Sequence, residues 1–318
     1  MMEYDNDDTW RRSSSPKFEE KKCKPLPRRS TTTAVIVLGL AVLSCLMGYC
    51  VLSESLPYES KTLRLVIILF RHGARAPVSS YKSDPFKNYQ WPDGLGSLTN
   101  IVAATKPCKF WKRMYKELLA EKNADLKYTE LFDYLSKHTN QSMRSVLEVD
   151  FLYSTLQTQQ EAGLKLPEWT KNVFPSKMKQ PFMLSLALLS YNESLQRLHT
   201  GPLLNNIRTH LQEAVTHTNM DRALYIYSGH DVTLVSLMRS LGYTDLLEPE
   251  YGASILLELH EEVEQDTFYV KLFYRNNTKV EVPMELKVPF CIEPCTYDKF
   301  VEHLGTLIPS DWESECQN

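Results

Sequence analysis

The stretch "LRLVIILFRHGARAP", from Leu63 to Pro77, decides the fold class. Its apolar run from Leu65 to Phe70 is rich in β-branched residues and lacks polar alternation, which is typical of a strand buried on both faces of a sheet. Open α/β sheets bind ligands at the carboxyl ends of such strands. The sequence therefore predicts that Arg71, His72 and Arg75 project into a crevice, and these grouped cations predict an anionic ligand.

A second strand with a polar end follows much later, in "ALYIYSGHD", from Ala223 to Asp231. We expect this strand to be buried as well. It passes directly into "VTLVSLMRSLG", a predicted helix that Gly242 terminates. His230 and Asp231 would then lie at a helix amino terminus, where backbone N–H groups and the helix dipole favour a phosphate. The two strand ends together predict a pocket for a phosphoryl group.

The remaining pattern supplies helices and a hairpin. Apolar residues recur at helical spacing in five segments between the two strands, namely Phe110 to Ala124, Tyr128 to His138, Met143 to Leu164, Met178 to His199 and Leu203 to Val215. Residues 253–276 read as two strands joined by an acidic turn, and Tyr297 to Leu307 as a last helix. This order predicts an α/β sandwich with a helical insertion over 109–200.

The composition and net charge limit the classes of function that the chain can have. With 318 residues, of which 43% are hydrophobic, the chain can bury a sizeable core. Its formal net charge of −3 gives no reason to expect a nucleic acid partner. Any preference for an anion must therefore be local.

The amino-terminal part predicts a membrane anchor. Residues 1–30 are polar and read as a disordered tail, whereas residues 31–52, "TTTAVIVLGLAVLSCLMGYCVL", carry no charge and are long enough to span a bilayer. Lysines and arginines just before this segment place the tail in the cytosol and everything after Leu52 in a lumen or outside the cell. A cleaved signal peptide is the alternative, but its polar leader would be unusually long.

Cysteines and glycosylation sequons agree with that topology. The part beyond the predicted span contains an even set of cysteines, Cys108, Cys291, Cys295 and Cys316, and three sequons that begin at Asn140, Asn192 and Asn276. Together they favour a secretory compartment. Zinc is a rival use for the cysteines, but "CIEPC" has no second paired motif and no nearby pair of histidines.

The predicted pocket suits phosphoryl transfer without a metal or another cofactor. Arginines beside His72 would lower its pKa, so the imidazole could attack phosphorus and form a phosphohistidine. Asp231 could then protonate the leaving oxygen. The plainer interpretations are a surface ion pair at Arg71 and a helix N-cap at Asp231. Other catalytic motifs, such as G-x-S-x-G, H-E-x-x-H and a Gly-rich phosphate loop, are absent from the sequence.

The lumenal part resembles a histidine acid phosphatase of the lysosomal and prostatic type. The family signature R-H-G-x-R-x-P is met by Arg71 to Pro77, and "YSGHDVTLVSLMRSLG", "WPDGLGSLT", "YGASILLELH", "VKLFYRNNT" and "IPSDWESEC" are similar to other parts of the family. The resemblance runs from about Leu63 to Cys316. It implies one phosphatase-like domain over 61–318, with a mixed central sheet, helices on both faces and a smaller, mainly helical domain.

The resemblance also implies roles for single residues. His72 would be the nucleophile, Asp231 the proton donor, and Arg71, Arg75 and His230 the phosphate ligands. Two bridges are expected, Cys108 with Cys316 and Cys291 with Cys295. A further disulfide of the family aligns with Ser154 and Ser254, so both of its cysteines are lost here.

One departure from the family bears on function. Between "SLTN" and "IVAATKPC" the family has several tens of residues, including a strand ending in R-S-T-D-x-D-R-T whose first arginine binds phosphate, and nothing here matches them. Three functions stay open: an acid phosphatase acting on phosphate monoesters in a lysosomal, endosomal or extracellular space, a catalytically silent relative that binds phosphorylated ligands, and an adhesion or receptor ectodomain. The sequence also leaves a homodimer open.

Overall fold

The computed structural model describes residues 62–73, 80–89, 108–218 and 222–317. The chain divides into two compact units, Met1–Pro57 and Tyr58–Asn318, and all described residues belong to the second. The predicted tail and membrane anchor, and Arg75, lie outside the described residues. Among the helices that are described, none is both long and apolar enough to cross a membrane.

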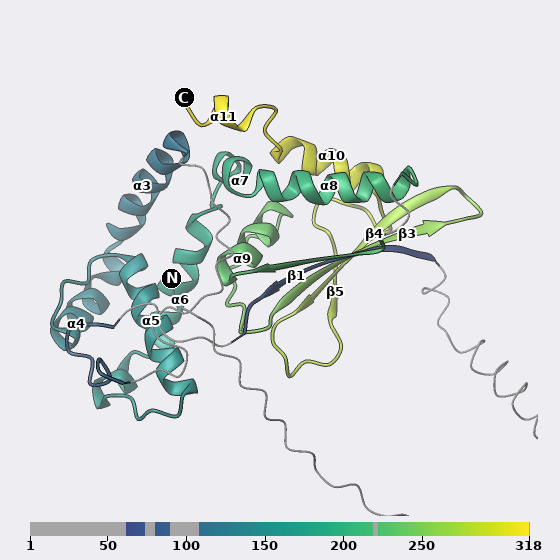
Figure 1. Ribbon diagram of the computed structural model, residues 1–318. Helices are drawn as coiled ribbons and strands as arrows, with labels where there is room; N and C mark the ends of the chain where they lie inside the picture. The colour runs from purple at the N-terminus through teal and green to yellow at the C-terminus, as the bar shows by residue number, and fades with distance from the viewer. Residues whose placement is uncertain (1–61, 74–79, 90–107, 219–221, 318) are drawn as a thin grey trace, which may run out of the picture. The chain divides into compact units, whose positions relative to one another are not determined.

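The described strands form one mixed sheet with the order β2-β1-β3-β4-β5 (Figure 1). The stretch that opens the sequence, β1 (Leu63–Arg71), pairs in parallel with β2 (Leu224–Gly229) and antiparallel with β3 (Ser254–Glu262). The hairpin continues through β4 (Thr267–Arg275), which also pairs with the short strands β5 (Met284–Leu286) and β6 (Cys295–Thr296). The mixed sheet confirms the predicted α/β class.

Helices occupy most of the chain between β1 and β2. In order they are α3 (Lys109–Asn123), α4 (Thr129–Thr139), α5 (Val146–Glu161), α6 (Ser176–Leu188), α7 (Glu193–His199) and α8 (Gly201–Val215). After β2 come α9 (Asp231–Ser240), α10 (Tyr297–Leu307) and α11 (Trp312–Glu315). The single helix expected over Met178–His199 is wrong. The Asn192 side chain accepts a hydrogen bond from Leu195 N at 3.0 Å and so starts α7 as a separate helix.

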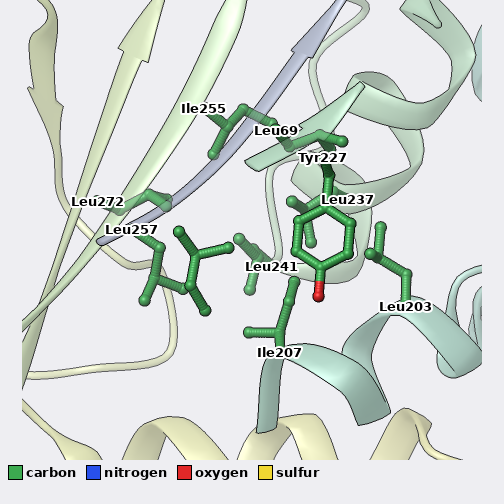
Figure 2. Close-up of a pocket in the computed structure, with 10 residues that line it drawn as sticks. Leu69, Leu203, Ile207, Tyr227, Leu237, Leu241, Ile255, Leu257 and Leu272 are labelled. Atoms are coloured by element: carbon green, nitrogen blue, oxygen red, sulfur yellow. The ribbon is translucent and has the colours of Figure 1, made fainter. Parts of the chain in front are cut away.

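One face of the sheet carries the larger hydrophobic core. Along β1, Leu65, Ile67 and Leu69 are buried and alternate with less buried residues, and side chains of helices α8, α9 and α10 belong to the same buried cluster. Figure 2 shows this layer, in which sheet side chains such as Leu257 meet helix side chains such as Leu237. The cavity between them is apolar and only about 10 Å³, so packing here is close.

Helices were predicted on both faces of the sheet, but the described helices cover only one. In the described part of the chain, the helices that pack on the sheet all contribute to the core just described, and Figure 1 shows them on one side. Strand β2 was expected to be buried, but Leu224 and Ile226 are 51% and 60% exposed. Exposed and partly buried side chains therefore alternate along β2, as in a strand with one covered face.

A second core lies among the helices. Side chains from α4, α5 and α6, including Leu135, Val149, Leu156 and Phe182, form a separate buried cluster. Helix α9 belongs to both cores, because Leu234 packs in the sheet core and Val235 in the helical one. The amino terminus of α9 is thus held between the sheet and the helices.

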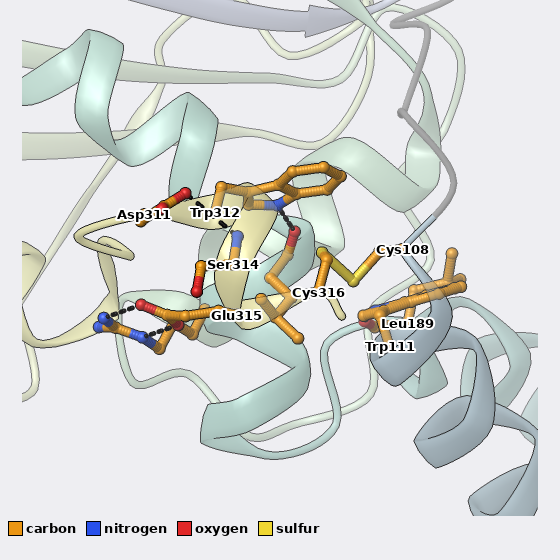
Figure 3. The surroundings of a disulfide bond; sticks show 10 residues. Cys108, Trp111, Leu189, Asp311, Trp312, Ser314, Glu315 and Cys316 are labelled. Carbon is orange, nitrogen blue, oxygen red and sulfur yellow. Dashed lines mark hydrogen bonds and ion pairs between the residues drawn. A yellow bond between two sulfur atoms is a disulfide. The ribbon is translucent and has the colours of Figure 1, made fainter. Parts of the chain in front are cut away.

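Both predicted disulfide pairings are confirmed. Cys108, just before α3, is bonded to Cys316 at the end of α11 (Figure 3), and Cys291 to Cys295. The first bridge is reinforced by Arg197, whose Nε and Nη2 each lie 2.7 Å from a Glu315 carboxylate oxygen. The carboxyl terminus is therefore fixed to the helical region.

The three sequons differ in exposure. Asn140 and Asn192 are exposed residues, at the end of α4 and the start of α7. Asn276 is partly buried, and its Nδ2 donates to Glu250 Oε1 at 3.1 Å. Two of the three predicted glycosylation sites are thus well placed for a glycan.

Candidate active site

Parallel pairing of β1 with β2 brings the two motifs together. Arg71 is in register with Gly229, and His72 N donates to Gly229 O at 3.1 Å. The ring centroids of His72 and His230 are 5.0 Å apart, with the rings nearly perpendicular. The predicted convergence of the two strand ends is therefore present in the structure.

A tight strand-to-helix turn presents His230 and Asp231. A Cβ on Gly229 would lie 3.2 Å from the Thr233 side chain and 3.3 Å from Leu69 Cδ1, so a larger residue would crowd the turn. His230 is the N-cap of α9, and its backbone N donates to Thr233 Oγ1 at 3.2 Å. Asp231 is the first helical residue, and its Oδ1 accepts from Val232 N at 2.8 Å.

Arg71 is enclosed on several sides. Only 3% of the residue is exposed. Its Nη2 lies 2.8 Å from Asp231 Oδ2, its Nη1 donates to Pro249 O at 2.6 Å, and its guanidinium carbon lies 4.2 Å from the centre of the Tyr251 ring. The backbone N of Arg71 also donates to Ala253 O at 2.8 Å. The guanidinium therefore has a fixed orientation.

One hydrogen-bond donor of the Arg71 guanidinium, Nε, is available to a ligand. Its Nε is buried and has no hydrogen-bond partner among the described residues. A buried charged donor without a partner is costly, so the atom indicates a ligand that accepts a hydrogen bond. A phosphate oxygen is such an acceptor, and a guanidinium binds it well.

The hydrogen bond of His72 defines which ring nitrogen can react. Its Nδ1 lies 2.7 Å from Gly73 O, and because a carbonyl can only accept, Nδ1 must carry the hydrogen. In the neutral ring the lone pair is then on Nε2. Nε2 is the atom that a nucleophilic role requires.

Two carboxyl groups near this site were missed in the sequence. Asp150 on α5 accepts from Ser185 Oγ at 2.8 Å and from Ser154 Oγ at 3.3 Å. Burial raises the pKa of Asp150 to about 7, and the negative charge of Asp231 adds to the rise. Burial also raises the pKa of Glu161, with Arg71 opposing the rise. In the sequence, Asp150 could have been noticed as an acidic residue within an apolar stretch of α5, "VLEVDFL".

Arg75 is a predicted phosphate ligand that lies outside the described residues, so its place in the site stays a prediction. Within the described residues, no group of three or more His, Cys, Asp or Glu side chains could hold a metal ion.

Comparison with known proteins assigns the chain to a family. The model of the histidine phosphatase superfamily (branch 2) matches residues 104–275, more than half of the chain. This chain belongs to the histidine phosphatase superfamily, branch 2. Its relatives include lysosomal acid phosphatase of Rattus norvegicus, 24% identical over 87% of this chain and 85% of the relative, and prostatic acid phosphatase of Homo sapiens, 24% identical over 81% and 88%.

Solved structures agree with the fold of the branch 2 family. The phytase of Citrobacter braakii matches with a TM-score of 0.56 and 16% identity, over 80% of this chain and 99% of the phytase. The apo phytase of Hafnia alvei matches with a TM-score of 0.58 and 13% identity, over 80% and 98%. By membership this branch 2 protein is a hydrolase of the acid phosphatase, or phosphomonoesterase, family.

The relatives also contain residues that this branch 2 member lacks. The alignment with the rat lysosomal enzyme runs over 364 positions, more than the 318 residues of the whole chain. Many aligned positions of the relative therefore have no counterpart here, and their location after "SLTN" stays a prediction.

Proposed function

We propose that this protein is an acid phosphatase that hydrolyses phosphate monoesters through a phosphohistidine intermediate. The observation that carries the proposal is the convergence of Arg71, His72, His230 and Asp231 at the ends of β1 and β2. The enclosed guanidinium of Arg71 keeps one donor for an anion, and in the neutral ring of the next residue, His72, the lone pair is on Nε2.

In the proposed reaction, Nε2 of His72 attacks the phosphorus atom and the bond to the leaving alcohol oxygen breaks. Asp231 gives that oxygen its proton. Water then attacks the phosphohistidine, Asp231 takes a proton from the water, and His72 and inorganic phosphate are released. Arg71, Arg75 and His230 stabilise the negative charge on the phosphoryl oxygens throughout.

In the proposed reaction, substrate binding also changes the ion pair between Arg71 and Asp231. Phosphoryl oxygens compete with Asp231 for the guanidinium. Bound substrate would therefore loosen the contact between Arg71 and Asp231 and leave that carboxyl group for the leaving oxygen.

Hydrolysis of an aryl phosphate at about pH 5, with vanadate as a competing ligand, tests the proposal. We expect turnover that vanadate inhibits in the wild-type chain. The matched variant Lys109→Ala, at the start of α3, should retain that turnover. If the wild-type chain hydrolyses the aryl phosphate no faster than a His72→Ala variant, the proposal is wrong.

A catalytically silent relative that binds phosphorylated ligands is the second candidate. The observation that favours it is the alignment with relatives that is longer than this chain. Losing one preorganised charge from a phosphoryl-transfer site costs about 10³ to 10⁵ in rate. We therefore expect this chain to be slower by several orders of magnitude, and less stable, than a chimera that carries the relative's extra segment between Asn100 and Ile101. Equal turnover in both would show that Arg71, Arg75 and His230 suffice.

For location, we propose that residues 31–52 anchor the protein in a membrane and that 61–318 lie in a lysosomal or endosomal lumen or outside the cell. Two disulfides and the exposed Asn140 and Asn192 support this side of the membrane. Glycosidase treatment should increase the electrophoretic mobility of the expressed protein. Protease added to sealed vesicles should leave peptides that contain Asn192 intact, and their loss would overturn the topology.

A further inference from the structure

Tyr251 lies beside the two strand ends but has no part in the reaction proposed above. Its ring centre is 4.2 Å from the guanidinium carbon of Arg71 and 6.1 Å from the ring centre of His72. The residue is partly buried. Tyr251 is therefore a neighbour of both the enclosed cation and the proposed nucleophile.

The contact with Tyr251 leaves the donors of Arg71 free for other partners. A guanidinium is planar, and its N–H groups point outward within that plane. Nη1 and Nη2 use these directions for Pro249 O at 2.6 Å and Asp231 Oδ2 at 2.8 Å, whereas a ring that contacts the face of the guanidinium uses no donor. Tyr251 can thus fix the tilt of the guanidinium while Nε stays available to a ligand.

The loop that carries Tyr251 is fixed to the chain segment after β4. Glu250 N donates to Asn276 O at 3.2 Å, and Glu250 Oε1 accepts from the side-chain nitrogens of Asn276 and Asn277, both at 3.1 Å. Gly252 has a φ of +74°, a conformation that glycine adopts more readily than other residues. These contacts hold the loop in place, and with it the position of Tyr251 against Arg71.

A second contact between an arginine and a tyrosine gives a comparison within the same chain. Arg239 is 8% exposed, and its guanidinium carbon lies 5.3 Å from the centre of the Tyr191 ring. Its nitrogens Nε, Nη1 and Nη2 all donate to backbone carbonyl oxygens, those of Ser190, Thr244 and Tyr191, at 3.0 to 3.2 Å. Arg71 is more deeply buried, yet its Nε has no acceptor among the described residues. A ligand at Nε accounts for this difference, and a purely structural role does not.

We propose that Tyr251 is a positioning residue of the phosphate site, which holds the guanidinium of Arg71 so that Nε faces the bound phosphate. This role rests on the proposed function, because it takes a phosphoryl group to be the ligand of Arg71. A cation–π contact is stronger where water is excluded, and only 3% of Arg71 is exposed. A donor that is already oriented loses little further freedom when the anion binds, so the anion binds more tightly.

The first experiment measures binding of inorganic phosphate to the full-length chain, in a mild detergent, by isothermal titration calorimetry. We expect Tyr251→Leu to raise the Kd for phosphate about tenfold, because leucine is apolar but offers no π face to the guanidinium. Tyr251→Phe keeps the ring, so its Kd should stay within about twofold of the wild-type value. Urea unfolding establishes that each variant is folded before its binding is measured.

The matched control is Tyr191→Leu, the same change beside the other buried arginine. A structural loss at either tyrosine lowers the urea midpoint, but only the change at Tyr251 should raise the Kd for phosphate. An equal rise of the Kd in both leucine variants would overturn the positioning role. A rise in Tyr251→Phe as large as in Tyr251→Leu would overturn it too, because the ring would then not be the group that acts.

A double-mutant cycle tests whether Tyr251 acts through Arg71. Arg71→Lys keeps the charge but has no planar group that can lie on the ring. We therefore expect Tyr251→Leu to change the Kd for phosphate by less than about twofold when residue 71 is already lysine. A rise of about tenfold in that background would show that Tyr251 acts independently of Arg71 and would overturn the proposal.

Phosphate binding and turnover distinguish this role from the proposed function. A chain that binds phosphate with the expected pattern, but hydrolyses aryl phosphates no faster than His72→Ala, supports the role of Tyr251 and rejects the phosphatase. A wild-type chain that binds no phosphate overturns the role of Tyr251, whatever its turnover.

Discussion

Arg71 and Asp231 form an ion pair in which Nη2 and Oδ2 are 2.8 Å apart, although the two residues are 160 positions apart in the sequence. The pair joins the last residue of β1 to the first residue of α9. It links the enclosed phosphate-binding cation of our proposal to its proton donor. Changes at either residue should therefore affect binding and proton transfer together.

Replacing Arg71 by lysine keeps the charge but removes the fork that contacts Asp231, Pro249 and a ligand at once. We expect kcat/KM to fall by about 10² or more, because a lysine cannot replace a fixed bidentate donor. Steady-state kinetics with an aryl phosphate measures the loss. The control is Arg64→Lys on the same strand, where Arg64 pairs with Glu261, and it should stay within about twofold. Equal rates in Arg71→Lys and Arg64→Lys would contradict the assignment.

Replacing Asp231 by asparagine removes the proposed proton donor while keeping its size. We expect cleavage of poor leaving groups, such as alkyl phosphates, to slow by about 10² to 10⁴, and cleavage of p-nitrophenyl phosphate to slow much less. A comparison of kcat across leaving groups of graded pKa checks this. A uniform loss across the series would show that Asp231 acts by holding Arg71 and does not supply the proton.

The pKa of Asp150 predicts a pH-dependent stability. Burial raises this pKa from 3.8 to about 7, so between these values the folded state keeps a proton that the unfolded chain has lost. Stability should therefore fall as the pH rises through that window, by about 1.4 kcal/mol per unit of pKa difference, a few kcal/mol in all.

Asp150→Asn cannot lose a proton, so it should have nearly the stability of wild type near pH 4 and exceed it increasingly toward pH 7. Urea unfolding from pH 4 to pH 7.5 measures the difference. The exposed Asp133→Asn on α4 is the control. A constant difference between Asp150→Asn and wild type over this range would show that Asp150 does not titrate there.

The bridge between Cys108 and Cys316 closes a loop of 208 residues, and on a chain-entropy estimate it stabilises the fold by about 4 kcal/mol or more. The bridge between Cys291 and Cys295 spans a separation of 4 residues and should contribute only about 2 kcal/mol on the same estimate. We expect the Cys108→Ser, Cys316→Ser double variant to unfold at clearly lower urea than the Cys291→Ser, Cys295→Ser variant. The reverse order would mean that Arg197 and Glu315 already hold the carboxyl terminus in place.

The parts of the site that follow from local patterns were predictable. The apolar run before Arg71 and the strand-to-helix junction at His230 each identify a strand end by themselves. The resemblance supplied the two disulfide pairs, which spacing alone leaves undetermined.

Features that depend on the surroundings of an element were not predictable. The exposed face of β2 was missed because an apolar strand has the same sequence pattern whether or not a helix covers its second face. The break between α6 and α7 was missed because Asn192 can either continue or cap a helix. The contact of Tyr251 with Arg71 joins residues far apart in the chain, so no local pattern indicates it.

Trapping the covalent intermediate tests the central claim most directly. The wild-type chain is mixed with an aryl phosphate carrying a labelled phosphoryl group at about pH 5, quenched in denaturant at alkaline pH, where phosphohistidine survives, and mapped by peptide. We predict label on the peptide that contains His72, none in His72→Ala, and accumulation of label in Asp231→Asn with a good leaving group. Undiminished hydrolysis by His72→Ala, or label on another residue, would contradict the account.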